Sequence, residues 1–420
     1  MKRRAFILGA GAAAGGALVL RPRDEGGPYP AYFSALNETL RKSGPGRPLV
    51  LIDRDRLLEN CRKVRARLPA GKAFRVVEKS LSSLPLLEAV MAATGTDRLM
   101  VFHQPHLDAV AQALPRSDVL LGKPMPARAA RTFYAGLKGA FNPARQLQWL
   151  IDSQARLLEY QQLARASGVR MRINVEIDVG LHRGGLREPA DLKPLLDVVR
   201  ADPDHLELAG LMGYDAHVGK IPSIVESREK SFAKACATYR AMQDALFAQE
   251  PGLRGKPLAF NGAGSPTLRL HTESSPLSEL AAGSCLVKPT DFDLDLLADL
   301  EPAAFIAAPV LKALEGSTLP GIEGASRALP WWNPNRQRTY FIYGGLWEAR
   351  YESPPGLRDN PLYGRSSNQA IVNGSHRVPL RVDDSVFLRP TQSERVLAEL
   401  GDIAVVSGGK LVDWWPVLSA

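Results

Sequence analysis

The feature that most constrains this chain is a regular alternation, between residues 48 and 261, of short apolar or β-branched runs with stretches of helical periodicity. Such runs predict buried strands, and their spacing leaves room for a helix between successive strands. We expect strands at Pro48–Asp53, Ala73–Glu78, Arg98–Phe102, Asp118–Leu121, Gln148–Ile151, Met171–Ile177, Leu206–Met212 and Leu258–Asn261. Helical periodicity is clearest at Arg54–Leu68, Leu84–Ala93, Ser153–Ala166 and Ile224–Ala248. Eight strands alternating with helices favour a closed (β/α)8 barrel over the alternative, a doubly wound open sheet.

The alternation stops near residue 290. Beyond it come short apolar runs bounded by Gly, Pro and Asn, at Ala303–Leu311, Arg338–Gly344, Ala370–Val372, Val378–Leu388 and Ile403–Val406. This pattern is typical of a β-rich domain. We therefore expect a barrel over residues 45–292 and a smaller β-rich domain over residues 293–420, with Leu314–Gln337 as an irregular loop.

Composition narrows the class of protein. Apolar residues make up 45% and charged residues 23% of the chain, the mix of an ordinary folded protein, which excludes a disordered chain. The three cysteines, Cys61, Cys236 and Cys285, lie far apart, so neither a disulfide scaffold nor a paired-cysteine metal site is predicted. The net charge of +9 is not gathered into a stripe, which argues against a nucleic-acid partner.

The N-terminus has the layout of an export signal. Lys2, Arg3 and Arg4 precede an apolar run, Ala5–Leu20, that is shorter than the roughly 20 residues needed to span a bilayer. The adjacent arginines resemble a twin-arginine signal, which directs a protein to the bacterial periplasm or cell envelope. We therefore exclude residues 1–27 from the fold and expect membrane contact only through this segment, if it is not cleaved.

Residues suited to catalysis follow four of the expected strands. In a barrel the active site lies at the carboxyl ends of the strands, and phosphate is held by loops after the last of them. The candidate segments are Glu78–Ser80, Asp178–Gly185, Gly213–His217 and Asn261–Thr267. They bring a lysine, an arginine, a histidine and a Gly/Ser loop to the same end of the barrel. A phosphorylated aldehyde cofactor bound to a lysine amine, pyridoxal phosphate, fits this set.

Each signal also has an ordinary structural interpretation. Taken by itself, Lys79 is most simply interpreted as a solvated loop lysine, and His217 as a hydrogen-bonded core histidine. Arg183 alone caps a helix or pairs with Asp178, and the segment 261–267 alone is a turn. Their joint position at four strand ends favours the functional interpretation.

The same segments resemble the fold-type III pyridoxal-phosphate enzymes, the group that includes D-threonine aldolase, D-serine dehydratase and the alanine racemase N-terminal domain. The resemblance covers about residues 45–420, and the segment IDVGLHRGG carries most of it. It implies that Lys79 forms the internal aldimine, and that Arg183 binds the phenolic oxygen of the cofactor. The other implied contacts are His182 lining the pocket, His217 against the ring with Tyr214 nearby, and a phosphate site at Gly264, Ser265, Gly283 and Ser284.

The chain departs from the metal-dependent members of that group. Those relatives carry a His-x-Cys or His-x-Asp pair after a proline, where this chain has Pro390–Glu394. Gln392 is a poor metal ligand and Glu394 alone does not make a site, so no metal ligands are predicted and a divalent metal is doubtful. Ala281 and Ala282 stand where racemases place an arginine against the pyridine nitrogen.

The leading hypothesis is a pyridoxal-phosphate enzyme acting on a D- or small amino acid, a lyase similar to D-threonine aldolase or D-serine dehydratase. Lys79 would be its catalytic base, with His217 as the second catalytic candidate. The alternatives are an amino-acid racemase, a catalytically altered protein that binds pyridoxal phosphate, and an unrelated barrel that binds a phosphosugar. The resemblance also implies a homodimer.

Overall fold

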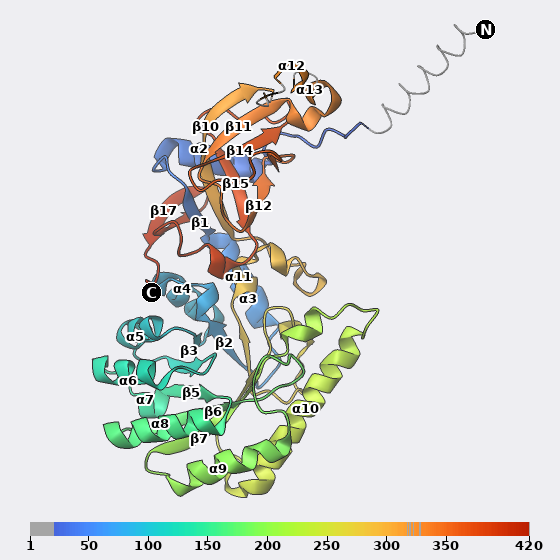
Figure 1. Cartoon of the computed structure of the whole chain (residues 1–420). Coiled ribbons are helices and arrows are strands. Elements are labelled where there is room, and N and C mark those ends of the chain that lie inside the picture. The colour runs from blue at the N-terminus through green and yellow to red at the C-terminus, as the bar shows by residue number, and fades with distance from the viewer. Residues whose placement is uncertain (1–20, 317, 319–320, 322, 327–328, 420) are drawn as a thin grey trace, which may run out of the picture. The chain divides into compact units, whose positions relative to one another are not determined.

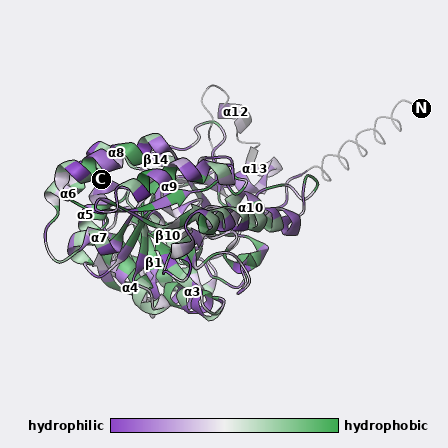
Figure 2. Cartoon of the chain, turned by 90° about the horizontal axis from the view of Figure 1, so that it is seen from below, coloured by the Kyte–Doolittle hydropathy of each residue, from purple (hydrophilic) through white to green (hydrophobic). Residues whose placement is uncertain are grey.

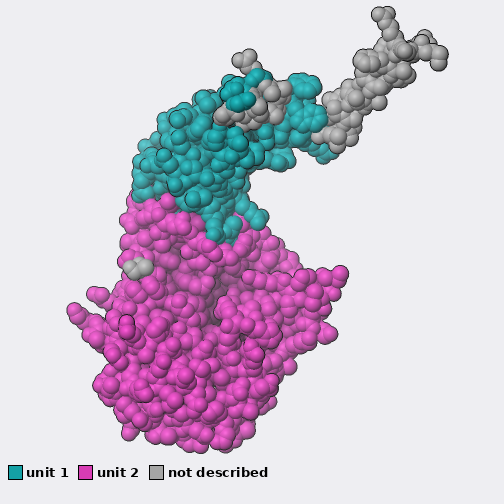
Figure 3. All heavy atoms as spheres, viewed as in Figure 1, with its two compact units in different colours: residues 1–51, 304–391, 404–413 teal, residues 52–303, 392–403, 414–420 magenta. Residues whose placement is uncertain are grey.

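The computed structural model describes residues 21–419 except 317, 319–320, 322 and 327–328. The chain divides into two compact units, coloured separately in Figure 3. The barrel unit comprises residues 52–303, 392–403 and 414–420, and the β-rich unit comprises residues 1–51, 304–391 and 404–413.

The barrel unit confirms the predicted fold class. Its eight parallel strands close on themselves, because the last strand pairs with the first. The strands are β2 (Ala73–Val77), β3 (Arg98–Val101), β4 (Asp118–Leu121), β5 (Leu147–Ile151), β6 (Met171–Glu176), β7 (Leu206–Gly213), β8 (Ala259–Gly262) and β9 (Glu279–Ala282). Their apolar side chains are buried almost throughout, as the near-continuous hydrophobic runs predict.

Helices connect the barrel strands, as Figure 1 shows. The longer ones are α3 (Arg54–Ala66), α4 (Leu84–Thr94), α5 (Gln104–Ala113), α6 (Ala127–Gly136), α8 (Gln154–Ser167), α9 (Leu192–Ala201) and α10 (Arg228–Gln249), and the shorter ones are α7 (Pro143–Gln146) and α11 (Ser284–Val287). Local chemistry explains their ends: α8 begins after Ser153, whose hydroxyl accepts from Arg156 N–H, and ends at Gly168 with a φ of +60°. Figure 2 shows hydrophilic and hydrophobic residues mixed along α8 and α10, each of which buries one face.

One strand assignment was wrong. The run Pro48–Asp53, expected to begin the barrel, forms β1 (Leu49–Asp53) in the sheet of the other unit, between β10 and β16. The eighth barrel strand is instead β9, a four-residue run that follows the predicted Gly/Ser loop. The error has a physical reason: every residue of β1 is buried, and a buried apolar run fits either sheet equally well.

The β-rich unit is built on a nine-stranded sheet in the order β13-β14-β11-β10-β1-β16-β17, with β15 pairing both β10 and β12. Its remaining strands are β10 (Ala304–Glu315), β11 (Arg338–Tyr343), β12 (Ala349–Ser353), β13 (Arg358–Asp359), β14 (Gln369–Gly374), β15 (Ser385–Pro390), β16 (Ile403–Ser407) and β17 (Lys410–Trp415). Its helices are α2 (Ala31–Ser43), α12 (Glu323–Ser326) and α13 (Leu329–Trp332), the last two within the segment expected to be an irregular loop.

After β15, the chain returns to the barrel unit. Residues 392–403 belong to that unit and contain a 3₁₀ turn, Ser393–Arg395.

The expected export segment is described only in part. Residues 1–20 lie outside the described residues, while Glu25 N–H donates to Asn335 Oδ1 at 3.0 Å. No helix in the described part of the chain combines the length and the apolar character needed to cross a membrane.

Candidate active site

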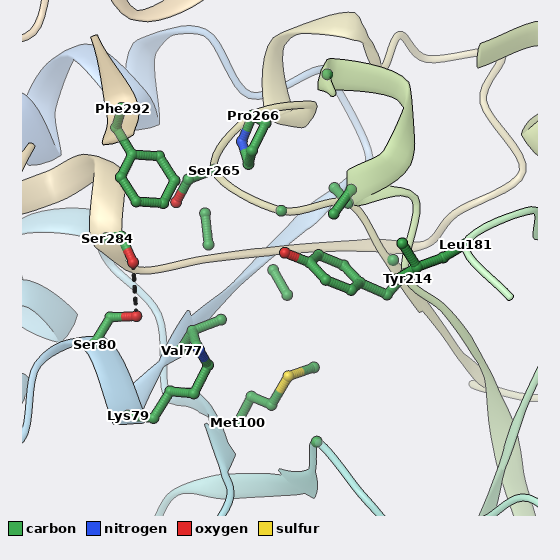
Figure 4. A pocket seen from close by; sticks show the side chains of 18 of the residues that line it. Val77, Lys79, Ser80, Met100, Leu181, Tyr214, Ser265, Pro266, Ser284 and Phe292 are labelled. Carbon is green, nitrogen blue, oxygen red and sulfur yellow. Dashed lines mark hydrogen bonds between the residues drawn. The ribbon is translucent and has the colours of Figure 1, made fainter. Parts of the chain in front are cut away.

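A cavity of about 490 Å³ opens at the carboxyl ends of the barrel strands. This volume is in the usual range for small-molecule sites, and the position is the one that barrels use for catalysis. Residues in or after β2, β3, β4, β6, β7, β8 and β9 line it, and Figure 4 shows several of them from close by. Its polar and titratable lining side chains are Lys79, Ser80, Arg183, Tyr214, Lys220, Asn261, Ser265, Ser284, Asp291, Gln392 and Glu394.

Lys79 lies on a 3₁₀ turn, Glu78–Ser80, directly after β2. Leu81 N–H donates to Glu78 O at 2.7 Å and closes this turn. The Glu78 carboxylate is fully buried and meets His106 Nδ1 at 2.8 Å, whereas the Lys79 side chain is 43% exposed and lines the cavity. Lys79 therefore follows the strand predicted to precede it, and that strand, β2, is the first of the barrel rather than the second.

The partner of Lys79 is Glu394. Lys79 Nζ donates to Glu394 Oε1 at 2.8 Å, and the lysine amine also lies 5.5 Å from the centre of the Phe102 ring. Burial by itself raises the pKa of Glu394, but the charge and hydrogen bond of Lys79 outweigh it, so this pKa lies below its usual value. From the sequence, Glu394 is a candidate only for a metal ligand, because no local signal links it to a residue as far away in the chain as Lys79.

Three serine hydroxyls gather beside the lysine. Ser284 Oγ donates to Ser80 Oγ at 2.8 Å, as the dashed line in Figure 4 marks, and Ser265 Oγ accepts from Cys285 N–H at 3.0 Å. All three serines are buried. Within the described residues, the N–H groups of Ser265 and Ser284 find no acceptor. Hydroxyls and free N–H groups on two adjacent loops are suited to a phosphate.

The two serine loops follow β8 and β9, the seventh and eighth strands of the barrel, where barrels commonly hold phosphate. Gly264 approaches the ring of Tyr214 so closely that a Cβ atom there would lie 2.5 Å from Cε2. Gly283 is equally constrained, since a Cβ atom would lie 2.5 Å from Val77 O. Ser265 and Ser284 thus line the cavity with Gly264, whereas Gly283 is a point of close backbone packing.

Asp215 holds the loop after β8 in place. Its carboxylate accepts from Thr267 Oγ1 at 2.6 Å and meets His271 Nε2 at 3.0 Å, with all three side chains buried. Thr267 Oγ1 in turn accepts from Gly264 N–H at 3.1 Å. No role for Asp215 is predicted from the sequence, although this residue stands within the motif GYDAH. Its two partners lie in a different loop, so the motif alone contains no signal for this function.

Arg183 and Tyr214 both line the cavity, with the guanidinium carbon 5.1 Å from the centre of the tyrosine ring. Burial raises the pKa of Tyr214. His182 does not line the cavity: its side chain is 76% exposed and its Nδ1 lies 2.8 Å from Asp178 Oδ2. The backbone of His182 has a φ of +55°, and Asp178 also accepts from its N–H. This Asp178-centred turn directs Arg183, rather than His182, to the cavity.

His217 also lies outside the cavity lining, on the 3₁₀ turn Ala216–Gly219. Its Nε2 would lie 2.8 Å from a Cβ atom at Gly180, so the ring packs closely against that glycine. Its Nδ1 is buried and has no partner in the part of the chain described, and burial lowers the pKa of the ring. The structure thus brings Lys79, Arg183, Tyr214, Gly264, Ser265 and Ser284 to one cavity, but not His182, His217 or Gly283.

Gln392 and Glu394, which were considered above as metal ligands, have other partners. Gln392 Nε2 donates to Asp291 Oδ2 at 2.9 Å, and Glu394 pairs with Lys79. Over the described ranges, no group of three or more His, Cys, Asp or Glu side chains is arranged to hold a metal ion.

Comparison with known proteins agrees with this geometry. Residues 52–290 match the family described as "Alanine racemase, N-terminal domain". No curated protein matches the chain. The fold is similar to D-threonine aldolase from Filomicrobium marinum, with a TM-score of 0.66 and 16% identity over 88% of this chain and 94% of that one. It is equally similar to alanine racemase from Bacillus anthracis (0.66, 15%, 88% and 97%) and to D-threo-3-hydroxyaspartate dehydratase from Delftia sp. HT23 (0.65, 16%, 91% and 99%).

Proposed function

The chain belongs to the alanine racemase N-terminal domain family, whose enzymes depend on pyridoxal phosphate, and we propose that it is such an enzyme acting on a D- or small amino acid. The proposal rests on one observation: Lys79 and the serines of two loops suited to phosphate line the same cavity. The amine and the anion site are the two groups that a phosphorylated aldehyde requires.

The residues present fit this cofactor. Its phosphate would be held by the hydroxyls of Ser80, Ser265 and Ser284 and by the free N–H groups of the last two, which are buried polar groups in need of a partner. Its aldehyde would meet Lys79 Nζ, and Arg183 would face its ring substituents from beside Tyr214. When bound, pyridoxal phosphate supplies a carbonyl carbon for amines and a ring that withdraws electrons from the substrate.

Several of the lining side chains then have distinct tasks. Lys79 binds the cofactor and, once released, holds or removes a proton at its Nζ. Arg183 and Tyr214 orient the bound molecules, since the stacked guanidinium limits how the tyrosine ring can turn. Asp215 keeps the loop of Gly264 and Ser265 rigid through Thr267. Met100, Phe102 and Phe292 form apolar walls that exclude water.

We propose a lyase reaction similar to those of D-threonine aldolase and D-serine dehydratase. The Glu394 carboxylate lies in the segment where, by the resemblance, such enzymes carry their metal ligands. Racemisation is the second candidate, and one observation favours it: the cavity offers Tyr214 from β7 as well as Lys79 from β2. A racemase needs two groups that exchange protons with opposite faces of one carbon.

The reaction type can be tested by giving the loaded enzyme D-serine, D-threonine and D-alanine in D₂O. A lyase releases a keto acid or an aldehyde from the β-hydroxy amino acids, with or without added divalent metal. A racemase instead converts D-alanine to the L-enantiomer with deuterium at Cα. A protein that binds the cofactor through Lys79, yet does neither and exchanges no Cα proton, would be a catalytically altered member of the family.

A further inference from the structure

The ion pair between Lys79 and Glu394 assigns a chemical task to the glutamate, and this inference rests on the proposed function. We propose that Glu394 is the base that takes a proton from the ammonium group of the incoming amino acid and delivers it to Lys79 Nζ as the amino acid displaces the lysine from the cofactor. Glu394 would then be a catalytic residue, because it touches the reacting nitrogen.

The geometry meets the first requirement of a general base, which is hydrogen-bond reach of the proton. Glu394 Oε1 lies 2.8 Å from Lys79 Nζ, and both side chains line the same cavity. The Glu394 side chain is 26% exposed, so it can receive a proton from a molecule in the cavity. The amino group of a substrate must approach the carbon to which Lys79 is bound, and it therefore passes beside this carboxylate.

The other carboxylates near the lysine are engaged elsewhere. Glu78, the neighbour of Lys79 in sequence, is fully buried and bonds to His106. Asp291 accepts from Gln392, and its carboxylate has no recorded contact with Lys79 in the described part of the chain. The remaining charged or titratable side chains that line the cavity are Arg183, Tyr214 and Lys220. Arg183 and Lys220 are cationic side chains and burial raises the pKa of the Tyr214 phenol, so none of the three supplies a carboxylate.

The proposed step balances in atoms and electrons. An N–H bond of the substrate ammonium breaks, and its proton goes to a Glu394 oxygen. The freed lone pair forms a bond to the carbon that is joined to Lys79, and one of the two bonds from that carbon to Nζ gives its electron pair to Nζ. A second proton then moves from the substrate nitrogen to Nζ, the pair it leaves forms the second bond to the carbon, and the remaining bond to Nζ breaks with its pair on Nζ. Glu394 returns the first proton to Nζ. The substrate nitrogen has thus lost two protons and Nζ has gained two, with no oxidant or reductant.

The ion pair places the Glu394 carboxylate beside the nitrogen that must receive the proton. Against the effect of burial, the charge and hydrogen bond of Lys79 lower the pKa of Glu394, which keeps its carboxylate ionised at neutral pH. An ion pair with a merely structural role would affect cofactor retention or stability. It would not distinguish nucleophiles by their charge, and that difference provides the test.

The experiment compares two nucleophiles on the loaded enzyme by stopped-flow absorbance of the cofactor band. Glycine is mostly an ammonium ion at neutral pH and has no β-substituent to be cleaved, whereas hydroxylamine is uncharged. For Glu394→Gln we expect the reaction with glycine to slow about 100-fold at pH 7, and to recover by about tenfold per pH unit as free amine accumulates. The reaction with hydroxylamine should stay within about twofold of the wild-type rate.

Three variants serve as controls. Asp291→Asn removes the other carboxylate that lines the cavity. This variant should react with both nucleophiles as the wild type does. Glu394→Asp should recover part of the glycine rate. Glu394→Ala leaves space for a small acid, so formate but not chloride should accelerate its reaction with glycine. This rescue keeps the inference testable if the glutamine variant folds poorly.

Two results would overturn the inference. The first is equal slowing of glycine and hydroxylamine in Glu394→Gln, and the second is no slowing of either. Failure of the proposed function is a separate result: a wild-type protein that shows no Lys79-dependent cofactor band overturns both conclusions. A wild-type protein with that band and a Glu394→Gln variant with unchanged rates overturns only the role of Glu394.

Discussion

Arg75 and Glu279 form a two-pronged ion pair inside the barrel, with Arg75 Nε 2.6 Å from Glu279 Oε1 and the second guanidinium nitrogen 2.8 Å from Oε2. Both side chains are completely buried, and they join β2 to β9 where the barrel closes. Arg75 also donates to Asp118, and Glu279 also accepts from Arg98 and Asn261.

Removing one member of this pair should destabilise the fold strongly. Glu279→Gln leaves the buried Arg75 charge only partly compensated, and we expect a loss of about 3 kcal/mol in the free energy of unfolding at pH 7. Urea denaturation of both proteins measures it, with Glu59→Gln, an exposed pair on α3, as the control expected within about 0.5 kcal/mol of wild type. A loss that small in Glu279→Gln would contradict the account.

The same pair predicts a pH dependence. Burial by itself raises the pKa of Glu279, but the charges and hydrogen bonds of Arg75 and the charge of Arg98 outweigh it, so the pKa is lowered. A carboxyl group with a lowered folded-state pKa stabilises the fold above its ordinary value of about 4.3, and this contribution is lost as the pH falls through the folded-state pKa. The stability gap between wild type and Glu279→Gln should therefore be widest near neutral pH and narrow in acid. A gap that widens below pH 4 would refute this sign.

Asp215 should control how firmly pyridoxal phosphate is held. Asp215→Ala leaves Thr267 and His271 buried without their acceptor, which costs roughly 1–3 kcal/mol and loosens the loop of Gly264 and Ser265. We expect the cofactor dissociation constant, measured by fluorescence titration, to rise about tenfold or more. Asp197→Ala, which removes an exposed ion pair on α9, is the matched control. Unchanged affinity in Asp215→Ala would show that the loop needs no such support.

Gly264 tests the shape of the cavity. In Gly264→Ala the added Cβ would lie 2.5 Å from the Tyr214 ring, so the tyrosine must move into the cavity or the loop must move away. We expect cofactor affinity to fall about tenfold while the protein stays folded by circular dichroism. Gly252→Ala, where nothing lies within 4 Å of the new atom, should bind as the wild type does. Equal affinity in both variants would place the cofactor elsewhere.

The N-terminal arginines make a prediction about location. We propose that Arg3 and Arg4 direct export of the folded protein to the periplasm or cell envelope. Replacing both with lysine should retain the protein in the cytoplasm, as cell fractionation would show. Substitution of Lys2 with Arg is the control and should leave export intact. Export that survives the double replacement would exclude the twin-arginine route.

Much of the fold could be predicted because the barrel strands are buried on both faces and stand out as apolar runs. The exchange of β1 for β9 shows the limit of that signal: burial makes a strand apolar, but it does not say which sheet the strand joins. The run of β9 is as short as β3, β4 and β8, and its place in the barrel emerges only from its pairing with β2 and β8.

The site could be predicted in part. Lys79, Arg183 and the serines lie at the cavity because each follows the carboxyl end of a strand. In a barrel of parallel strands, all carboxyl ends lie on the same face. The side chains of His182 and His217 lie outside the cavity. The His182 ring pairs with Asp178, and the His217 ring packs against Gly180, where no Cβ atom stands in its way. Glu394 could not be predicted, because its contact with Lys79 depends on the path of the chain from β15 to the barrel unit.

The most direct test of the central claim is the absorbance of the protein loaded with pyridoxal phosphate, before and after borohydride, in the wild type, Lys79→Ala and Lys220→Ala. Lys220 is the matched control, because it lines the same cavity. We predict a yellow band that borohydride bleaches in the wild type and in Lys220→Ala, with the cofactor mass fixed on the peptide that contains Lys79. Lys79→Ala should lack this band. A wild-type protein that stays colourless, or a Lys79→Ala protein that keeps the reducible band, would contradict the account.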